Sequence, residues 1–211
     1  MPVDHSHAFA YGPLYPSPER MKALRPSRPK MRAAKALWAA FRSSAIVAED
    51  ALLGPNAVCI NDRRDANAIQ IGSGAIVRGI LRLNGFGEGP IVVGAGSYIG
   101  DDVIISAASG VRIGDEVLIS HGVSIFDNDS HPMDWRARRA HYAAIRSGGR
   151  CDVEIATRPV TIGDYCWIAM NSTILKGTSI GDRSVVSAGS VVRGDFGRDC
   201  RISGNPARAI G

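Results

Sequence analysis

No apolar stretch of this 211-residue sequence approaches the roughly 20 residues that a bilayer-spanning helix requires. The first ten residues contain Asp4, His5 and His7, and no apolar core follows them, so a secretory leader is not expected either. These two absences argue against a helical membrane protein. They predict a cytoplasmic location, with the inner face of the membrane as the alternative.

Cysteine is scarce and scattered. The four residues Cys59, Cys151, Cys166 and Cys200 form no Cys-x-x-Cys pair. This spacing argues against a structural zinc site, and it provides no disulfide framework. We therefore expect four ordinary reduced thiols.

What the sequence does contain is a repeat in which an aliphatic residue, or in one case a cysteine, recurs every six positions. The repeating positions are Leu53 and Cys59; Ile71, Val77 and Leu83; Val93, Ile99 and Ile105; Ile113, Ile119 and Ile125; and Ile162, Ile168, Ile174, Ile180, Val186 and Val192. Glycine or another small residue often follows each of them. An α-helix has no period of six, and the regular glycines and Gly-Asp turns are incompatible with one long strand.

A triangular coil accounts for this repeat. Three hexads make one complete coil, and each hexad supplies a short strand and a corner. Leu53 and Ile71 are separated by exactly this spacing of three hexads, and so are Ile162 and Ile180. The step from Ile71 to Val93 is one coil plus four residues, and the step from Val93 to Ile113 is one coil plus two residues. Spacing leaves the hand of the coil open, although the general rule favours right-handed crossovers.

A long loop interrupts the repeat. The step from Ile113 to Ile162 is far longer than one coil, so a loop of about residues 127–158 leaves the solenoid. Long loops without a repeat of their own are often functional. We therefore divide the chain into an N-terminal basic arm, residues 1–50, and a solenoid domain, residues 51–211, that carries this loop.

The arm contains eight basic residues and no acidic residue between Arg20 and Arg42. Proline opens an expected helix over residues 29–44, in which Leu37, Trp38 and Phe41 recur at helical spacing. The favoured interpretation is a helix that covers the open end of the solenoid, where strand edges would otherwise be unpaired. The alternative is a basic helix that contacts the membrane surface.

Several segments resemble the hexapeptide-repeat acyltransferases. They are Ile162-Gly163-Asp164-Tyr165-Cys166-Trp167, Ile168-Ala169-Met170-Asn171-Ser172-Thr173, Ile174-Leu175-Lys176-Gly177-Thr178-Ser179 and the tail Gly204-Asn205-Pro206-Ala207-Arg208. The tail is similar to the closing coils of the maltose, galactoside and capsule-sugar O-acetyltransferases. The resemblance covers about residues 50–211. It implies an all-β, left-handed parallel β-helix and a homotrimer with active sites between neighbouring subunits.

The resemblance also implies a reaction: direct transfer of an acetyl group from acetyl-CoA to a sugar hydroxyl. The segment Asp127-Asn128-Asp129-Ser130-His131-Pro132-Met133-Asp134-Trp135-Arg136 resembles the catalytic stretch of the family, and its form is most similar to members that acetylate surface-polysaccharide sugars. His131 is the expected general base, because imidazole titrates near neutral pH.

A neighbouring group should orient the imidazole of His131. We take Asp129 as this catalytic partner, while Asp127, Asp134 and a backbone carbonyl remain alternatives. Asp127, Asp134, Trp135 and His141 are the expected acceptor-binding residues.

The donor is expected to lie along the coils, between two subunits. By resemblance, Trp167, Ala169 and Met170 line its start, and Ala188 and Gly189 allow close backbone approach. Arg193 and Arg208 are placed to meet its phosphates, with Lys176 as a weaker candidate. Two positions depart from the family's pattern. The usual basic pair is here Arg193-Gly194, and Gly100 stands near the position of an asparagine that assists substrate binding in relatives.

Other function classes remain open. They are an amino-sugar N-acetyltransferase, a non-catalytic trimeric scaffold, and a metalloenzyme resembling the γ-type carbonic anhydrases. His121, His131 and His141 lack the closely spaced pair expected of that zinc site, so we expect no metal. An acyl-enzyme on Cys151 or Cys166 is the rival mechanism. We expect no nucleic-acid partner.

Overall fold

The computed structural model describes residues 28–149 and 153–210. The chain divides into two compact units, residues 1–33 and 34–211. Most of the basic arm therefore lies outside the described residues. The second unit holds the complete solenoid and is the subject of the description that follows.

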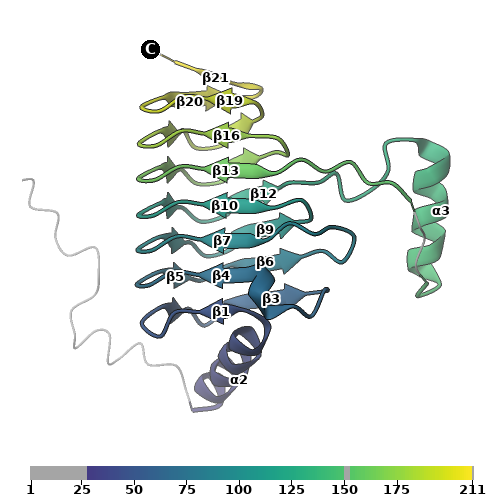
Figure 1. Ribbon diagram of the computed structural model, residues 1–211, viewed down its shortest axis with the longest axis horizontal. Helices are drawn as coiled ribbons and strands as arrows, with labels where there is room; N and C mark the ends of the chain where they lie inside the picture. The colour runs from purple at the N-terminus through teal and green to yellow at the C-terminus, as the bar shows by residue number, and fades with distance from the viewer. Residues whose placement is uncertain (1–27, 150–152, 211) are drawn as a thin grey trace, which may run out of the picture. The chain divides into compact units, whose positions relative to one another are not determined.

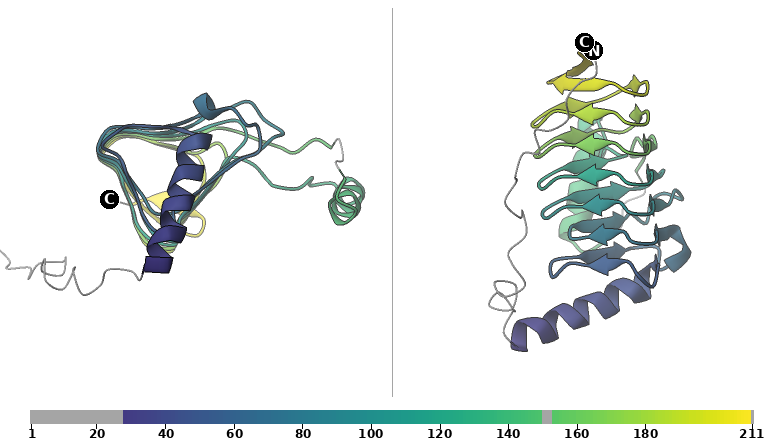
Figure 2. Two further views of the ribbon diagram at one scale, coloured as in Figure 1. Left: turned by 90° about the horizontal axis from the view of Figure 1, so that it is seen from below. Right: turned by 90° about the vertical axis from the view of Figure 1, so that its left-hand side faces the viewer.

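Three sheets, parallel except for the closing antiparallel pair of β20 and β21, stack along the solenoid (Figure 1) and form the three faces of a triangle (Figure 2, left panel). Sheet A consists of β1 (Ile46–Val47), β4 (Ile69–Ile71), β7 (Ile91–Val93), β10 (Val111–Ile113), β13 (Val160–Ile162), β16 (Ser179–Ile180) and β19 (Asp195–Phe196). Sheet B consists of β2 (Leu52–Leu53), β5 (Ile76–Val77), β8 (Tyr98–Ile99), β11 (Leu118–Ile119), β14 (Trp167–Ile168), β17 (Val185–Val186), β20 (Arg201–Gly204) and β21 (Ala207–Ala209). Sheet C consists of β3 (Val58–Asn61), β6 (Ile80–Leu83), β9 (Ile104–Ala107), β12 (Ser124–Phe126), β15 (Thr173–Ile174) and β18 (Val191–Val192). The expected left-handed parallel β-helix is confirmed.

The hexad repeat produces this fold by stacking like side chains. In sheet A, Ile113 pairs with Ile162 and Ile162 with Ile180, and all three are at most 2% exposed. Burying one such side chain contributes about 1.5–3 kcal/mol. The small residue four positions after such an aliphatic residue lies buried at a corner of the triangle. There Ser172, for example, donates its hydroxyl to the carbonyl of Ser187 at 3.0 Å.

The corners bring successive coils into close contact. Gly114 lies at the corner between sheets A and B, below the equivalent Gly163. A Cβ atom at position 114 would collide with the carboxylate of Asp164 and would lie 2.8 Å from its backbone nitrogen. Glycine at this corner is therefore a packing requirement.

The register corrects one expectation about coil length. Leu53 pairs with Val77 and Val47 with Ile71, so the first coil is four hexads long rather than the three inferred from Leu53 to Ile71. The additional residues include the 3₁₀ turn η1 (Ala66–Ala68). The inferred steps from Ile71 to Val93 and onward are confirmed by the pairing of sheet A.

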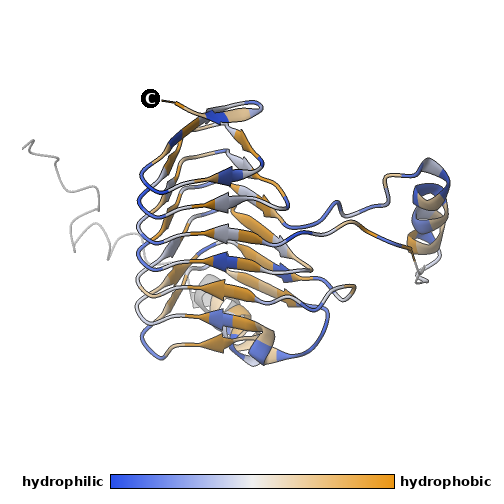
Figure 3. Ribbon diagram, turned by 45° about the horizontal axis from the view of Figure 1, so that its top comes forward, coloured by the Kyte–Doolittle hydropathy of each residue, from blue (hydrophilic) through white to orange (hydrophobic). Residues whose placement is uncertain are grey.

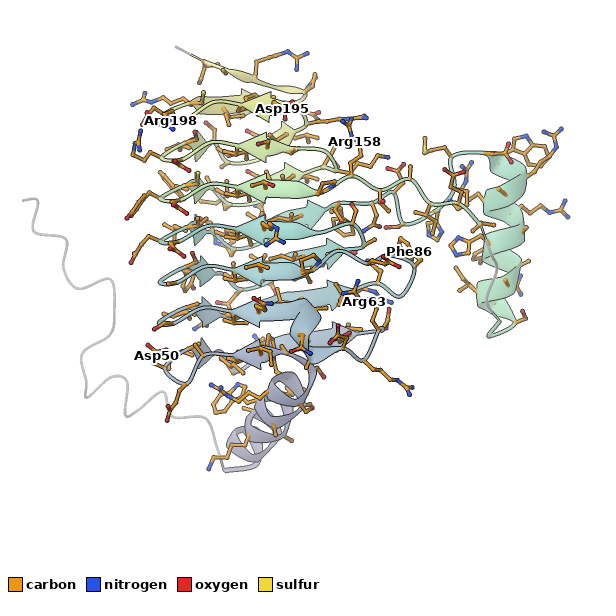
Figure 4. All side chains as sticks on the ribbon, in the orientation of Figure 1. Asp50, Arg63, Phe86, Arg158, Asp195 and Arg198 are labelled. Carbon is orange, nitrogen blue, oxygen red and sulfur yellow. The ribbon has the colours of Figure 1, made fainter. Side chains whose placement is uncertain are left out.

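Every lengthened connection in the described coils runs from sheet C to sheet A. These four connections are residues 62–68, 84–90, 108–110 and 127–159, and we call their common edge the C–A corner. All four extend from the same corner of the triangle in the left panel of Figure 2. In Figure 4, the labelled residues Arg63, Phe86 and Arg158 lie at this corner, on the side of the coils toward α3. The opposite edges keep the regular six-residue step.

The expected N-terminal helix is confirmed as α2 (Arg28–Ser44). From Ala34 onward it packs on the first coil: Phe41 is 1% exposed within the core cluster. The indole of Trp38 donates to the carbonyl of Gly54 at 2.7 Å, and Arg42 donates to that of Ala51 at 3.1 Å. This part of the helix therefore covers the end of the solenoid, as the favoured interpretation requires.

The long loop contains a helix that its sequence pattern did not predict, α3 (Trp135–Arg146). It carries both hydrophilic and hydrophobic residues along its length, as Figure 3 shows, and none of them is buried. Among the described helices, none is long and apolar enough to cross a membrane.

Candidate active site

The inserted segment begins on a buried carboxylate. Asp127 is 0% exposed, and its two oxygens accept hydrogen bonds from the backbone N–H groups of Ala108 (2.8 Å) and Gly110 (2.6 Å) in the preceding coil. The side-chain amide of Asn128 donates a further bond to it at 2.9 Å. Asp127, expected to bind an acceptor, is therefore occupied in anchoring the insertion to the coil below.

The two ends of the insertion form a short antiparallel stem. Asn128 bridges to Thr157, the N–H of Asp129 donates to Ala156 at 3.1 Å, and that of Arg158 donates to Asp127 at 2.8 Å. Lys176, from the next coil, forms an ion pair with the carboxylate of Asp129. Asp129, expected to orient His131, therefore pairs with a lysine instead. Lys176, the weaker candidate for binding donor phosphates, is held at the stem by this ion pair.

A tight turn presents His131 at the top of this stem. Ser130 adopts a left-handed backbone conformation, φ 61°, and donates its N–H to the Asn128 side chain at 3.0 Å. The N–H of His131 donates to the carbonyl of Asp129 at 2.6 Å. Since Asn128 is itself 5% exposed, the exposed imidazole of His131 stands on a buried, hydrogen-bonded base.

The imidazole of His131 meets that of His141, ten residues later on α3. Their Nδ1 atoms are 3.3 Å apart, and the rings cross at 60° with centroids 5.2 Å apart. A hydrogen bond between two Nδ1 atoms requires one to carry the proton and the other to accept it. When His131 is the donor, its Nε2 keeps a free lone pair. Sequence spacing did not indicate this pairing, because it depends on where α3 lies.

Asp134 and Arg138 hold the start of α3 against the turn. The carboxylate of Asp134 caps the helix by accepting the N–H of Ala137 at 2.9 Å. The guanidinium of Arg138 donates to the carbonyls of Pro132 (2.9 Å) and Met133 (2.8 Å). Asp134, expected to bind the acceptor, thus positions the helix that carries His141.

A cavity of about 420 Å³ opens beside His131, and its other lining residues are Trp135, Arg138, Arg139 and Tyr142. Trp135 was an expected acceptor-binding residue. The other three were missed, although their spacing from Trp135 along the loop is that of one helix face. The wall contains no carboxylate, so the cavity combines a potential base, two aromatic rings and two positive charges.

A second cavity, of about 720 Å³, lies between α3 and the loops of the C–A corner. It is lined by Asn61, Asp62, Arg64, Arg82, Gly85, Phe86, His141, Ile145, Gly149, Val153 and Ile155. Here an arginine is already neutralised, since Arg82 and Asp62 form an ion pair at 3.1 Å. His141 therefore stands between two cavities of different electrostatic character.

The expected donor-binding residues Trp167, Ala169, Met170, Ala188 and Gly189 come together elsewhere. They lie on or just after β14 and β17, where sheet B turns into sheet C, an edge we call the B–C corner. The N–H of Gly189 donates to the carbonyl of Met170 at 2.9 Å, and a Cβ atom at Gly189 would meet nothing within 4 Å. The indole and thioether side chains of this edge are about half exposed: Trp167 47% and Met170 46%.

The two expected arginines do not join this group. Arg193 follows β18 at the C–A corner, and Arg208 lies on β21 with its guanidinium donating to the neighbouring carbonyl of Ala207 at 2.9 Å. Within one chain, His131 at the C–A corner and Trp167 at the B–C side thus belong to different edges of the triangle.

Metal-binding and thiol chemistry have little support in the described residues. No group of three His, Cys, Asp or Glu side chains there could hold a metal ion, and His121 lies at the B–C corner, away from the pair formed by His131 and His141. Cys166 is buried, its thiol donates to Gly181 at 3.2 Å, and burial raises its pKa, which disfavours the nucleophilic thiolate. Cys151 lies outside the described residues.

Comparison with known proteins agrees with this architecture. The family model of the bacterial transferase hexapeptide (six repeats) matches residues 159–194, and that of the hexapeptide repeat of succinyl-transferase matches residues 90–127. The putative lipopolysaccharide biosynthesis O-acetyl transferase WbbJ of Escherichia coli is 32% identical over 136 residues, which are 62% of this chain and 64% of WbbJ. The galactoside O-acetyltransferase of Escherichia coli is 40% identical over 57 residues, 27% of this chain and 28% of that enzyme. The alignments thus span less than two thirds of these relatives.

Two solved structures extend the comparison to most of the chain. The hexapeptide-repeat containing acetyltransferase VCA0836 of Vibrio cholerae is 25% identical, with a TM-score of 0.55 over 87% of this chain and 86% of its own. AntD, an N-acyltransferase of Bacillus cereus, shares the fold at 18% identity, with a TM-score of 0.60 over 88% and 89% of the two chains. Repeat, coil architecture and relatives agree: the chain carries the hexapeptide repeats of the bacterial transferases and is similar to the hexapeptide-repeat acyltransferases.

Proposed function

We propose that this protein transfers an acetyl group from acetyl-CoA to a hydroxyl of a sugar, and that His131 is the general base. The observation that carries the proposal is the placement of His131: its imidazole stands on a rigid turn, touches His141 through Nδ1, and faces a cavity. The relatives WbbJ and galactoside O-acetyltransferase, an O-acetyl transferase of lipopolysaccharide biosynthesis and a sugar O-acetyltransferase, support the acceptor class.

The contact with His141 is compatible with the tautomer that the reaction requires, in which Nδ1 of His131 carries the proton, and we assign that tautomer. When Nδ1–H of His131 donates to Nδ1 of His141, the Nε2 lone pair takes the proton of the acceptor hydroxyl as its oxygen attacks the thioester carbonyl. The tetrahedral intermediate then expels the coenzyme A sulfur, which receives that proton from the imidazolium. His141 takes the orienting role that was assigned to Asp129, whose carbonyl instead fixes the backbone of His131.

The donor is proposed to bind at the B–C corner, along Trp167, Met170 and Gly189, where the backbone faces open space. Since His131 lies at another edge of the same chain, a second subunit must bring its B–C corner to the first subunit's His131. A homotrimer of parallel solenoids supplies three such pairings. Sedimentation equilibrium should therefore give three times the chain mass.

The experiment that tests the proposal separates donor binding from chemistry. Coenzyme A is titrated into wild-type and His131→Ala proteins by calorimetry, and acetyl transfer is then measured over a panel of sugars. We expect both proteins to bind coenzyme A at about one per chain and the variant to lose about 10²–10⁴-fold in kcat. Absence of binding at millimolar coenzyme A in folded, assembled protein would overturn the proposal and favour a scaffold.

The same panel addresses the alternative acceptor. Sugars that differ only in an amine or a hydroxyl at one position report whether nitrogen or oxygen is acetylated. A preference for the amine in kcat/KM would change the assignment to an amino-sugar N-acetyltransferase while leaving the role of His131 intact.

A further inference from the structure

We propose that the cavity beside His131 selects a sugar that carries an anionic group, a phosphate or a carboxylate, and that Arg139 is its principal ligand. This inference rests on the proposed function for its location and adds the charge of the acceptor. It concerns the cavity formed by His131, Trp135, Arg138, Arg139 and Tyr142.

The charge of α3 is the first observation. The helix contains four arginines, Arg136, Arg138, Arg139 and Arg146, and no acidic residue between Trp135 and Arg146. None of its residues is buried, so this charge is not there to satisfy a partner in the core. Four positive charges on one short helix attract an anion and repel one another, which disfavours the helix unless a ligand offsets the repulsion.

The individual arginines differ in how they are engaged. Arg136 stacks 4.5 Å over the ring of Trp135, and Arg138 is held by the carbonyls of Pro132 and Met133. The guanidinium of Arg139 makes no hydrogen bond or ion pair with any residue in the described part of the chain, yet Arg139 lines the cavity. A guanidinium presents its donors as a planar fork that matches a carboxylate or phosphate, so Arg139 is available to bind one.

The aromatic side chains are the second observation. Trp135 is 55% exposed and Tyr142 59% exposed, and both lie on the cavity wall. Large apolar side chains exposed around a concave site mark a ligand surface. Flat rings can cover a sugar while Arg139 holds its charged group, and this places a hydroxyl near His131. A neutral sugar would use the rings and leave the guanidinium without a partner.

The second cavity provides a contrast within the same molecule. It also contains arginines, but Asp62 neutralises Arg82 there at 3.1 Å. The wall beside His131 offers no such carboxylate. The excess of positive charge is therefore larger beside the proposed base, where two arginines face no carboxylate, than in the second cavity, where Asp62 offsets one of the two arginines.

Binding is tested without turnover, so that the inference and the proposed function can fail separately. Glucose 1-phosphate, glucuronate and glucose are titrated into the full-length protein, and the imidazole signals of His131 and His141 are followed by NMR. We expect both anionic sugars to bind at least tenfold more tightly than glucose. A common affinity for all three would overturn the inference, whereas the relative affinity of phosphate and carboxylate identifies the source of the charge.

Matched variants localise the effect. Arg139→Ala should remove the preference for anionic sugars, and Arg139→Lys should restore part of it as a point charge. Arg146 is outside the cavity wall, with its guanidinium 6.0 Å over the Tyr142 ring. Arg146→Ala changes the net charge of the same helix equally and leaves Arg139 in place, so it should keep the preference for anionic over neutral sugars. Equal losses in Arg139→Ala and Arg146→Ala would refute local recognition.

The phosphates of the donor are the competing explanation. Coenzyme A affinity is therefore measured in the same variants by calorimetry. Loss of coenzyme A binding in Arg139→Ala would assign the arginine to the donor and overturn the inference, and so would an Arg139-dependent association with anionic vesicles in place of the sugars. Anionic sugars that bind a protein without acetyl transfer would leave the inference standing and refute the proposed function.

Discussion

The buried carboxylate of Asp127 provides the sharpest test of how the insertion is held. Replacing it with asparagine keeps its shape and removes one of the two acceptor oxygens. One oxygen of Asp127 accepts hydrogen bonds from the N–H of Ala108 and the side-chain amide of Asn128, and the other accepts from the N–H groups of Ala108 and Gly110. Whichever way the new amide turns, its NH₂ group faces either the N–H of Gly110 or the amide of Asn128.

The magnitude follows from those contacts. A hydrogen bond to a charged group contributes about 1.5–3 kcal/mol, and a buried donor without a partner costs about 1–3 kcal/mol. Asp127→Asn loses one such bond and weakens the others, so the free energy of unfolding should fall by about 2–4 kcal/mol. Asp62→Asn is the matched control, because its ion pair with Arg82 at 3.1 Å is nearly half exposed and should contribute about 1 kcal/mol or less.

Urea unfolding at one fixed protein concentration measures both variants, since assembly makes the midpoint depend on concentration. The order of the two losses is the test. A loss in Asp127→Asn below about 0.5 kcal/mol would show that neighbouring groups or water replace the missing acceptor, and the anchoring argument would be refuted.

Other contacts of the described residues give three further predictions. His141→Asn keeps an acceptor near the Nδ1 position and should retain more kcat than His141→Leu, with coenzyme A affinity unchanged; equal activities would remove His141 from the mechanism. The buried Cys166, whose pKa is raised because burial disfavours its thiolate, should resist iodoacetamide at pH 8 until urea unfolds the protein, and peptide mass spectrometry would reveal earlier labelling. Gly114→Ala should lower stability by about 1–3 kcal/mol or more, because its Cβ meets the backbone of Asp164; an unchanged melting temperature would contradict this packing.

The hexad repeat was sufficient to predict the solenoid because each inward residue contacts its own equivalent in the next coil. The pairing of Ile113, Ile162 and Ile180 is visible as spacing alone. The first coil was misjudged because Leu53 and Ile71 happen to be three hexads apart although they lie in different sheets. Spacing cannot distinguish a regular coil from a longer one whose extra residues fall at a corner.

The site was harder to predict because its contacts join distant segments. The three carboxylates near His131 look alike in sequence, but their roles depend on contacts with other coils. Asp127 accepts hydrogen bonds from Ala108 and Gly110 of the preceding coil, and Asp129 forms an ion pair with Lys176 of the following coil. The helix α3 was missed because it buries no residue, which leaves the Asp134 cap as its main local signal. Without that helix, the contact between His131 and His141 cannot be inferred.

The confinement of all added residues to the C–A corner has an evolutionary consequence. Because the other two corners keep a constant six-residue step, the packing of the stacked core does not depend on the length of the loops at the C–A corner. Insertions of different length and sequence can then replace one another at this corner without changing the pairing register of any strand. Transplanting residues 127–158 onto a related solenoid would thus test whether acceptor preference moves with the proposed acceptor site while the proposed donor edge stays unchanged.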